Sequence, residues 1–210
     1  MERTLTPSRK RDRLTTDRAA LDALLEEVLV AYVGICLPEG PLVLPVSFAR
    51  DGDRVLLHGS TGSHRMRALA AGTPICLTVA TVDALKVARS GFGTGMRYRS
   101  ACLFGVCEVL LGEDKDRALA AYTDRYLPGR SREVRPIAAK EAAATLLLAL
   151  PIDQWSMKVA GGFPDDDPDD VAGTAWAGVV PLQPVWGDPV RNPDLADGIA
   201  VPASVRALRR

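Results

Sequence analysis

Apolar runs separated by turn residues fill the first half of the chain. Residues 18–29 repeat leucines at the spacing of one helical face, and Thr16 or Asp17 can cap the start of that helix. Residues 30–37 and 42–50 are apolar, and a Pro-Glu-Gly-Pro turn separates them. The pattern therefore predicts a helix followed by two strands.

The next part of the chain has a clear hairpin signal. Asp51-Gly52 stands between two apolar runs, which is typical of a tight turn joining antiparallel strands. A short helix is predicted over 63–71, because it begins at a serine and stops at a glycine. Three further runs, 74–82, 84–90 and 98–111, continue the strand pattern.

The second half mixes helical and extended patterns. Amphipathic spacing predicts a helix over 114–127, and the alanine-rich run 138–150 predicts a second one. Strands are predicted over 153–162 and 174–182, with the acidic loop 165–170 between them. Short consecutive strands with hairpin signals favour an antiparallel barrel with flanking helices over a doubly wound parallel sheet.

The domain organisation follows from this pattern. We expect one domain over residues 16–182, preceded by a basic, solvated arm over residues 1–15. Proline and glycine are frequent from Gln183 on, so residues 183–210 are expected to form a Pro-rich tail, whose end, residues 204–210, is expected to be poorly ordered. No internal repeat is visible.

Charge and cysteine content limit the functional classes. Lys and Arg number 26, as do Asp and Glu, so net charge gives no drive toward nucleic acid or membrane. The chain has no apolar run long enough for a transmembrane helix and no signal-peptide pattern, so we expect a cytoplasmic protein. The four cysteines form no CxxC pair, so they are expected to be small buried side chains rather than zinc ligands.

The stretch "LLHGSTGSHRMRALAAG", residues 56–72, contains both histidines of the chain. It runs from a predicted strand into a predicted helix, and Gly59 and Gly62 allow a tight turn and a close approach to the backbone. Ser63 is the expected N-cap. A helix N-terminus has unpaired N–H groups and a partial positive charge, so it favours an anion.

The side chains of this turn suit a phosphate group. Ser60 and Ser63 supply hydroxyl groups, and His64 and Arg65 supply charge-assisted donors. A capped helix with solvated arginines explains the same residues, and the pattern alone does not decide between the two. A metal pair of His58 and His64 is disfavoured, because no acidic third ligand lies in the turn.

Two more places carry candidate residues. Tyr98, Arg99 and Ser100 begin an otherwise apolar strand, so they form either the rim of a pocket or a solvated hairpin. Lys158 and Trp176 lie in the two last predicted strands. Packing is the simplest role for the tryptophan and solvation for the lysine.

Several of these segments together resemble a known family. The order "PLVLPVSFAR", "RVLLHGSTGSHRMRALAAGTPICLTV", "MRYRSACLFGVCEVL", "LALPIDQWSMKV" and "WAGVVPL" resembles the pyridoxamine 5'-phosphate oxidase-related flavoproteins. It is most similar to their flavin-nucleotide-binding subgroup, which includes nitroimidazole-resistance proteins. The resemblance covers most of residues 10–182 and leaves out the C-terminal tail.

The resemblance implies an antiparallel split β-barrel homodimer with FMN in clefts at the subunit interface. On the phosphate side of FMN it implies His58, Ser60, Ser63, His64 and Arg65. Along the ring system it implies Leu44, Pro45, Val46, Tyr98, Arg99 and Ser100, with Lys158 and Trp176 near the cofactor. One departure is clear: relatives often carry a histidine pair where this chain has Gly93 and Thr94.

The function implied is an FMN-dependent oxidoreductase that passes electrons from a nicotinamide donor to a small acceptor. Arg99 or Lys158 would place a positive charge beside the reduced flavin. Two alternatives stay open. The chain could bind flavin for storage or sensing without turnover, or the same barrel could hold the deazaflavin F420 or haem.

Overall fold

A computed structural model describes residues 10–209, so the first nine residues of the expected arm lie outside the described residues. The chain divides into two compact units, and each is described by itself. The first comprises Met1–Val46, Pro74–Gly105 and Ile152–Gln183, and the second comprises Ser47–Thr73, Val106–Pro151 and Pro184–Arg210.

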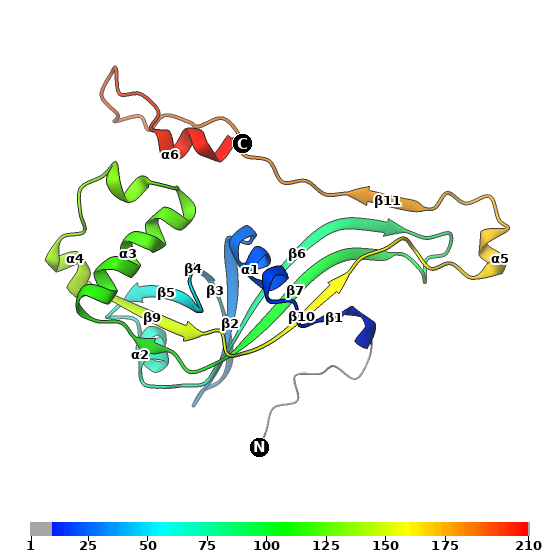
Figure 1. Cartoon of the computed structure of the whole chain (residues 1–210), viewed down its shortest axis with the longest axis horizontal. Coiled ribbons are helices and arrows are strands. Elements are labelled where there is room, and N and C mark those ends of the chain that lie inside the picture. The colour runs from blue at the N-terminus through cyan, green and yellow to red at the C-terminus, as the bar shows by residue number, and fades with distance from the viewer. Residues whose placement is uncertain (1–9, 210) are drawn as a thin grey trace. The chain divides into compact units, whose positions relative to one another are not determined.

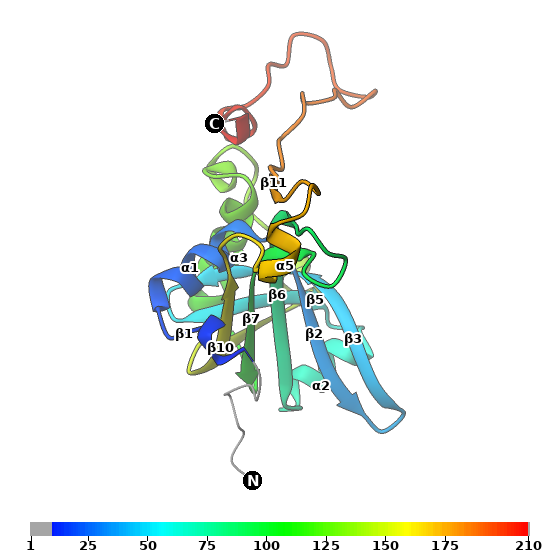
Figure 2. The same cartoon turned by 90° about the vertical axis from the view of Figure 1, so that its right-hand side faces the viewer.

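The first unit is built on a sheet with the strand order β1-β10-β7-β6-β2-β3, and β11 pairs with β6 (Figures 1 and 2). β10 pairs antiparallel with β7, and β7 pairs antiparallel with β6. The strands are β1 Leu14–Thr15, β2 Val30–Leu37, β3 Gly40–Ser47, β6 Ile75–Val87, β7 Gly95–Gly105, β10 Gln154–Ala160 and β11 Gly178–Pro181.

Helix α1, Arg18–Glu27, covers one face of this sheet. Asp17 caps it, because its carboxylate accepts hydrogen bonds from the N–H groups of Ala19 (2.9 Å) and Ala20 (3.3 Å). Three leucines at one-face spacing, Leu21, Leu24 and Leu25, are fully buried. The predicted helix and its leucine face are confirmed.

Strand β6 joins two runs that the sequence separates into 74–82 and 84–90. It is one strand of 13 residues, and its register against β7 shifts between Val82 and Ala84. This β-bulge places Asp83 outside the regular pairing. Asp83, which separates the two predicted strands in the sequence, therefore lies at a bulge within a single strand.

The sheet of the first unit has one buried face and one that is largely open. Side chains on the α1 side are buried, among them Val33, Leu77, Val79, Ala101, Leu103 and Met157. Side chains alternate along a strand, so their neighbours point the other way. We call that side the open face, and it carries Tyr32, Cys36, Cys76, Thr78, Leu85, Met96, Tyr98, Ser100, Cys102 and Lys158.

The cysteines do not all match the expectation of burial. Cys107 is buried, and this burial raises the pKa of its thiol to about 12. Cys36 is exposed, and Cys76 and Cys102 are half-buried. The reason is strand alternation, which directs these three onto the open face, and all four cysteines are free thiols.

The second unit is built on a four-stranded sheet with the order β4-β5-β9-β8. All three pairings are antiparallel. The strands are β4 Ala49–Asp51, β5 Arg54–Ser60, β8 Glu108–Val109 and β9 Thr145–Pro151. The helices are α2 His64–Ala70, α3 Gly112–Tyr126, α4 Ala139–Ala144 and α6 Ala203–Arg206. Short 3-10 turns follow at Arg130–Arg132 and Ala207–Arg209, and another lies at Arg11–Arg13 in the first unit.

The single helix predicted over 138–150 is wrong in its second half. Only Ala139–Ala144 is helical, and Thr145–Pro151 forms β9, which pairs with β5 along its whole length. Leu147, Leu148 and Leu150 are completely buried. A continuous apolar run has the same pattern in a buried strand as in a buried helix, so periodicity could not separate them.

Two smaller differences concern the last part of the chain. The acidic stretch predicted as a loop contains the short helix α5, Pro168–Val171, with its proline in the first turn. The strand predicted over 174–182 is shorter and spans Gly178–Pro181. No helix among the described residues is long and apolar enough to cross a membrane.

Candidate functional site

The turn between β5 and α2 is fixed by its own hydrogen bonds. The Ser63 N–H donates to the Ser60 carbonyl (3.0 Å), and the Gly62 N–H donates to Ser60 Oγ (3.1 Å). Ser63 Oγ accepts from the Met66 N–H (3.3 Å), which confirms the predicted N-cap. The Thr61 N–H donates to the carbonyl of Ala144 at the end of α4 (2.9 Å), so the turn is held to its neighbour as well.

Helix α2 lies directly on β5 because residue 59 is a glycine. A Cβ atom at Gly59 would come within 2.6 Å of Met66 Cγ, which is closer than carbon atoms pack. Met66 and Leu69 are buried on this side of the helix. The missing side chain at Gly59 therefore sets the height of the helix start above the strand.

His64 and Arg65 occupy the first turn of α2 and point to solvent. Both are exposed, and neither side chain makes a hydrogen bond or ion pair within the part of the chain that the structure describes. Arg67 is different, because its guanidinium donates to the Thr61 carbonyl (3.0 Å) and supports the turn. Unpaired donors and the helix N-terminus together form a place for an anion.

His58 lies apart from this group although it is close in sequence. Its ring packs edge-on against Tyr122 of α3, with ring centroids 4.5 Å apart. Partial burial lowers the pKa of His58. Gly59, the next residue, faces α2, so strand alternation places His58 on the α3 side of the sheet (Figure 1). The structure thus brings Ser60, Ser63, His64 and Arg65 together and leaves His58 on the opposite face.

The candidate residues of β7 also divide between two faces. Ser100 pairs with Lys158 of β10, and Tyr98 lies on the same face two residues away. Lys158 is half-buried, and its ammonium group has no described partner. Three predicted residues, Tyr98, Ser100 and Lys158, therefore meet on the open face.

Arg99 points to the other side of the sheet and is balanced by two carboxylates. Its guanidinium contacts Glu27 at 2.8 and 2.9 Å and Asp83 at 2.5 to 3.2 Å. These contacts raise the pKa of Arg99 above its usual value, first through Asp83 and then through Glu27. Its charge is neutralised locally, so of the two predicted cations only Lys158 offers an unbalanced positive charge.

The other predicted residues lie at the margins of the first unit's sheet. Leu44, Pro45 and Val46 are in β3, which ends the strand order, and an edge strand is where a proline is tolerated. Trp176 precedes β11 and is 65% exposed, so it is not a core residue. Its ring covers Gly178, where a Cβ atom would come within 2.8 Å of the indole.

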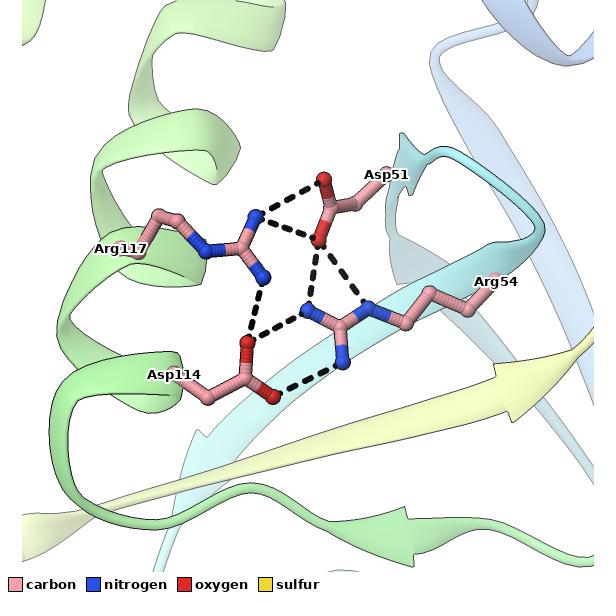
Figure 3. A network of polar contacts seen from close by, with 4 residues as sticks. All are labelled: Asp51, Arg54, Asp114 and Arg117. Carbon is pink, nitrogen blue, oxygen red and sulfur yellow. Dashed lines mark hydrogen bonds and ion pairs between the residues drawn. The ribbon is translucent and has the colours of Figure 1, made fainter.

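An ion network in the second unit was not found from the sequence (Figure 3). Arg54 of β5 contacts Asp51 at 2.7 and 3.0 Å and Asp114 of α3 at 2.8 Å twice. Arg117 contacts Asp114 at 2.5 Å and Asp51 at 3.5 Å. The network fixes the start of α3, the helix that carries Tyr122. The hairpin signal at Asp51 was visible in the sequence, but the pairing of Arg54 with Asp114, 60 residues away, was not.

The described residues form no preformed metal site. Among residues 10–209, no group of three or more His, Cys, Asp or Glu side chains is arranged to hold a metal ion. The histidines in particular lie on opposite faces of the β5–β9 sheet. A metal pair made by both of them is therefore not supported by the geometry.

Comparison with known families agrees with this architecture. The model of the pyridoxamine 5'-phosphate oxidase family matches residues 17–159, which is well over half of the chain. The chain belongs to the pyridoxamine 5'-phosphate oxidase family. No curated protein sequence gives a significant match.

Solved structures of this family include two that match nearly the whole chain. The FAD and haem binding protein from Mycobacterium smegmatis is 46% identical, with a TM-score of 0.91, over 94% of this chain and 97% of that one. The flavocytochrome Anf3 from Azotobacter vinelandii is 34% identical, with a TM-score of 0.90, over 97% and 95%. The fold prediction, mainly antiparallel β with flanking helices in the split β-barrel family, is confirmed.

A third structure, an FAD-binding protein from Mesorhizobium loti, shares the fold at low identity. It is 15% identical with a TM-score of 0.50, and the match covers 71% of this chain and 98% of that one. The two structures described above therefore share parts of this chain that the smaller protein lacks.

Proposed function

We propose that this protein binds a flavin nucleotide and haem and acts in electron transfer. The carrying observation is its 46% identity, over 94% of its length, to a protein named for binding FAD and haem. A flavocytochrome, 34% identical over 97% of the chain, supports the same pair of cofactors. The flavin expected from the sequence was FMN, and the relative from Mycobacterium smegmatis, which is named for FAD, favours FAD within the same proposal.

The residues at the β5–α2 turn fit the phosphate of a flavin nucleotide. Arg65 is exposed and has no described partner, and Ser63 orders the helix start beside it. The first N–H groups of a helix and a guanidinium both bind phosphate oxygens well. We assign phosphate binding to Ser60, Ser63 and Arg65.

Lys158 fits the redox part of the flavin. When bound, the flavin supplies the two-electron chemistry and haem the one-electron chemistry. Lys158 holds an unbalanced positive charge on an otherwise uncharged part of the open face, where Tyr98 and Ser100 lie beside it. A fixed cation stabilises negative charge that develops nearby, so Lys158 favours the reduced, anionic form of a flavin placed there.

His64 is our candidate for the iron ligand of haem. Imidazole is a common axial ligand, and the chain has two histidines. Both histidines are exposed, but the ring of His58 packs against Tyr122, whereas His64 has no described partner. His64 can therefore reach a metal without breaking a contact, and we propose it for the iron in place of the phosphate role that the resemblance implies.

The remaining parts of the proposal are a homodimer and a nicotinamide donor. Both come from the family resemblance, and the acceptor is not identified by any residue. Storage or sensing of flavin without turnover is the competing outcome. Reduction of the bound flavin by NADH or NADPH, followed by reoxidation with added acceptors, separates the two.

The cofactors are tested on the purified full-length protein. We expect flavin absorption together with a Soret band, and release by heat followed by mass spectrometry is expected to yield FAD and haem b. A protein that stays colourless after incubation with FAD, FMN and haemin contradicts the proposal. Release of FMN alone would support the FMN expected from the sequence and would exclude haem from the proposal.

The ligand assignment is tested by His64→Ala with His58→Ala as the matched control. We expect His64→Ala to lose or shift the Soret band while flavin content is unchanged. His58→Ala is expected to keep the Soret position, because its ring packs on Tyr122. A Soret change confined to His58→Ala would reassign the ligand.

A further inference from the structure

The part of the chain between β11 and α6 is extended and forms no regular secondary structure. We call residues 182–202 the C-terminal arm. It holds no helix and no strand, and residues 182–201 are all exposed. Figure 1 draws it as a plain orange trace that leads from β11 to α6.

The arm is rich in large apolar side chains, as is typical of a segment that packs against another surface. A third of its 21 residues are large apolar side chains, and all of these are exposed, Val190 at 95% and Val185 at 88%. The seven are Leu182, Val185, Trp186, Val190, Leu195, Ile199 and Val201. Segments that stay disordered are poor in such residues, and soluble proteins rarely expose so many together.

Both ends of the arm are held, each within its own unit. After β11 pairs with β6, the Leu182 N–H donates to the carbonyl of Asp83 (2.9 Å). At the other end, Ser204 is almost completely buried and donates to the Glu133 carboxylate from Oγ (2.5 Å) and N–H (3.1 Å). These two bonds lower the pKa of Glu133. The arm is therefore held at both ends. Its second half, from Pro189 to Pro202, borders a groove with Leu127, Arg130 and Glu133 of the second unit, whereas Val185 and Trp186 lie outside this groove.

The same chain also carries an exposed apolar surface in its first unit. Val180 pairs with Leu85, and Leu85 pairs with Met96, so these three side chains form one row across β11, β6 and β7. All three are exposed, and Phe92 at the tip of the β6–β7 hairpin is fully exposed. Hydrogen bonds from Gly93 to Ser90 (3.1 Å) and from Thr94 to Ser90 (3.0 Å) hold this tip in shape.

We propose that the C-terminal arm lies on a second copy of this chain, against the row of Val180, Leu85 and Met96. The inference rests on the homodimer of the proposed function and assigns the contact between the two copies to the C-terminal arm. In a two-fold dimer each arm meets the same surface of the other copy, so one contact is made twice.

The area available is sufficient for a stable dimer. A buried aromatic side chain covers about 150–250 Å². A standard interface needs about 800 Å² from each partner. At roughly 60–120 Å² for each of the six aliphatic side chains and 150–250 Å² for the tryptophan, one fully covered arm offers about 500–1,000 Å², which is of this order.

Limited proteolysis tests the arm in the native chain. Trypsin can cut after Arg191 in the middle of the arm, and mass spectrometry of the 192–210 fragment measures the rate. We expect cleavage to be at least about tenfold slower at concentrations where the protein is dimeric than after dilution to the monomer.

The matched variants are Val185→Asp/Val190→Asp in the arm and Leu111→Asp as a control. Leu111 is also exposed, at 71%, and precedes α3 as its N-cap, where aspartate is favoured. We expect the arm variant to raise the dimer dissociation constant at least about tenfold by analytical ultracentrifugation, and the control to leave it unchanged. Circular dichroism checks that each variant is folded.

The outcomes separate this inference from the proposed function. A wild-type dimer whose arm is cut as fast as in the monomer overturns the role of the arm and keeps the homodimer. A wild-type protein that is monomeric at every concentration overturns both. Cofactor content, measured on the same samples, reports on flavin and haem binding independently of either result.

Discussion

Arg65 is the residue on which the phosphate assignment can be tested most directly. Its guanidinium is exposed and has no described partner, so its removal breaks no internal contact. We expect Arg65→Ala to weaken FAD or FMN binding by about 1.5–3 kcal/mol, the range for a charge-assisted hydrogen bond. Riboflavin lacks the phosphate, so its affinity is expected to stay the same in fluorescence titrations.

Arg65→Lys is the matched variant for charge. It keeps the positive charge and loses the two-pronged geometry, so we expect an intermediate affinity for the nucleotide. Equal weakening of riboflavin and the phosphorylated flavins by Arg65→Ala would place this side chain away from the phosphate.

Gly59 is a residue whose role lies in the missing side chain. A Cβ atom there would meet Met66 Cγ at 2.6 Å, and Met66 is itself buried. We expect Gly59→Ala to lower the free energy of unfolding by about 1–3 kcal/mol, the usual cost of overpacking. Flavin binding should weaken as well, since α2 would move from β5. Urea unfolding and flavin titration measure the two effects.

Gly34→Ala is the control for this prediction. Gly34 also lies in a strand, but a Cβ atom there would be 3.6 Å from the Cys76 carbonyl oxygen, an ordinary contact. We expect little change or a slight gain in stability, because alanine is less flexible than glycine when unfolded. Similar losses in both variants would argue against a specific clash with Met66.

The neighbours Tyr98, Arg99 and Ser100 illustrate the limit of sequence reasoning at this scale. The three residues are consecutive in the sequence and were interpreted as one group. Because consecutive side chains of a strand point to opposite faces of the sheet, Arg99 lies on the face opposite Tyr98 and Ser100. Alternation could be anticipated from a strand prediction. The partners of Arg99 could not, because Glu27 is 72 residues away and Asp83 lies at a bulge that no local pattern marks.

At the scale of elements, the ion network of Asp51, Arg54, Asp114 and Arg117 determines the attachment of α3. Its hydrogen bonds hold the pKa of Asp114 well below its usual range, chiefly through Arg54. A carboxylate with a lowered pKa stabilises the fold when it is ionised. That stabilisation is complete above about pH 4–5, near the pKa of unfolded Asp, and fades as pH falls further.

We therefore expect Asp114→Asn to lower the melting temperature at pH 7, and the deficit to shrink as pH falls from about 4 toward 2. Glu113→Gln is the control, since Glu113 lies in the same first turn and has no described partner. Thermal unfolding followed by circular dichroism at several pH values measures both. A deficit that stays constant with pH would show that charge on Asp114 is not its source.

The segment 138–150 shows where secondary structure can no longer be predicted from local sequence. Its alanine-rich start is helical as its composition predicts, and its leucine-rich end became β9 because β5 offered a complete set of strand partners. Tertiary pairing overrode a local preference there. Where amphipathic spacing was clear, as in α1 and α3, the prediction was confirmed.

At the scale of the molecule, the fold family and most of the elements could be predicted from the sequence, and the partition of the chain could not. Each compact unit draws on three separate stretches, so the chain passes between them repeatedly. Such a partition depends on long-range pairing, which no local pattern encodes. The C-terminal arm was not anticipated for a related reason. Its prolines predicted a tail outside the domain, while its exposed apolar side chains indicate a contact.

Strand β1 has a consequence for how the protein can be shortened. Its two residues pair with Met157 and Lys158, and they are the last strand in the order on that side of the sheet. A chain begun at residue 16 would lose the strand that pairs with Met157 and Lys158, and the backbone of these two residues at the edge of β10 would be open to another molecule. Leu14 and Thr15 thus reduce edge-to-edge aggregation by occupying part of this strand edge, and truncations made for expression should retain them.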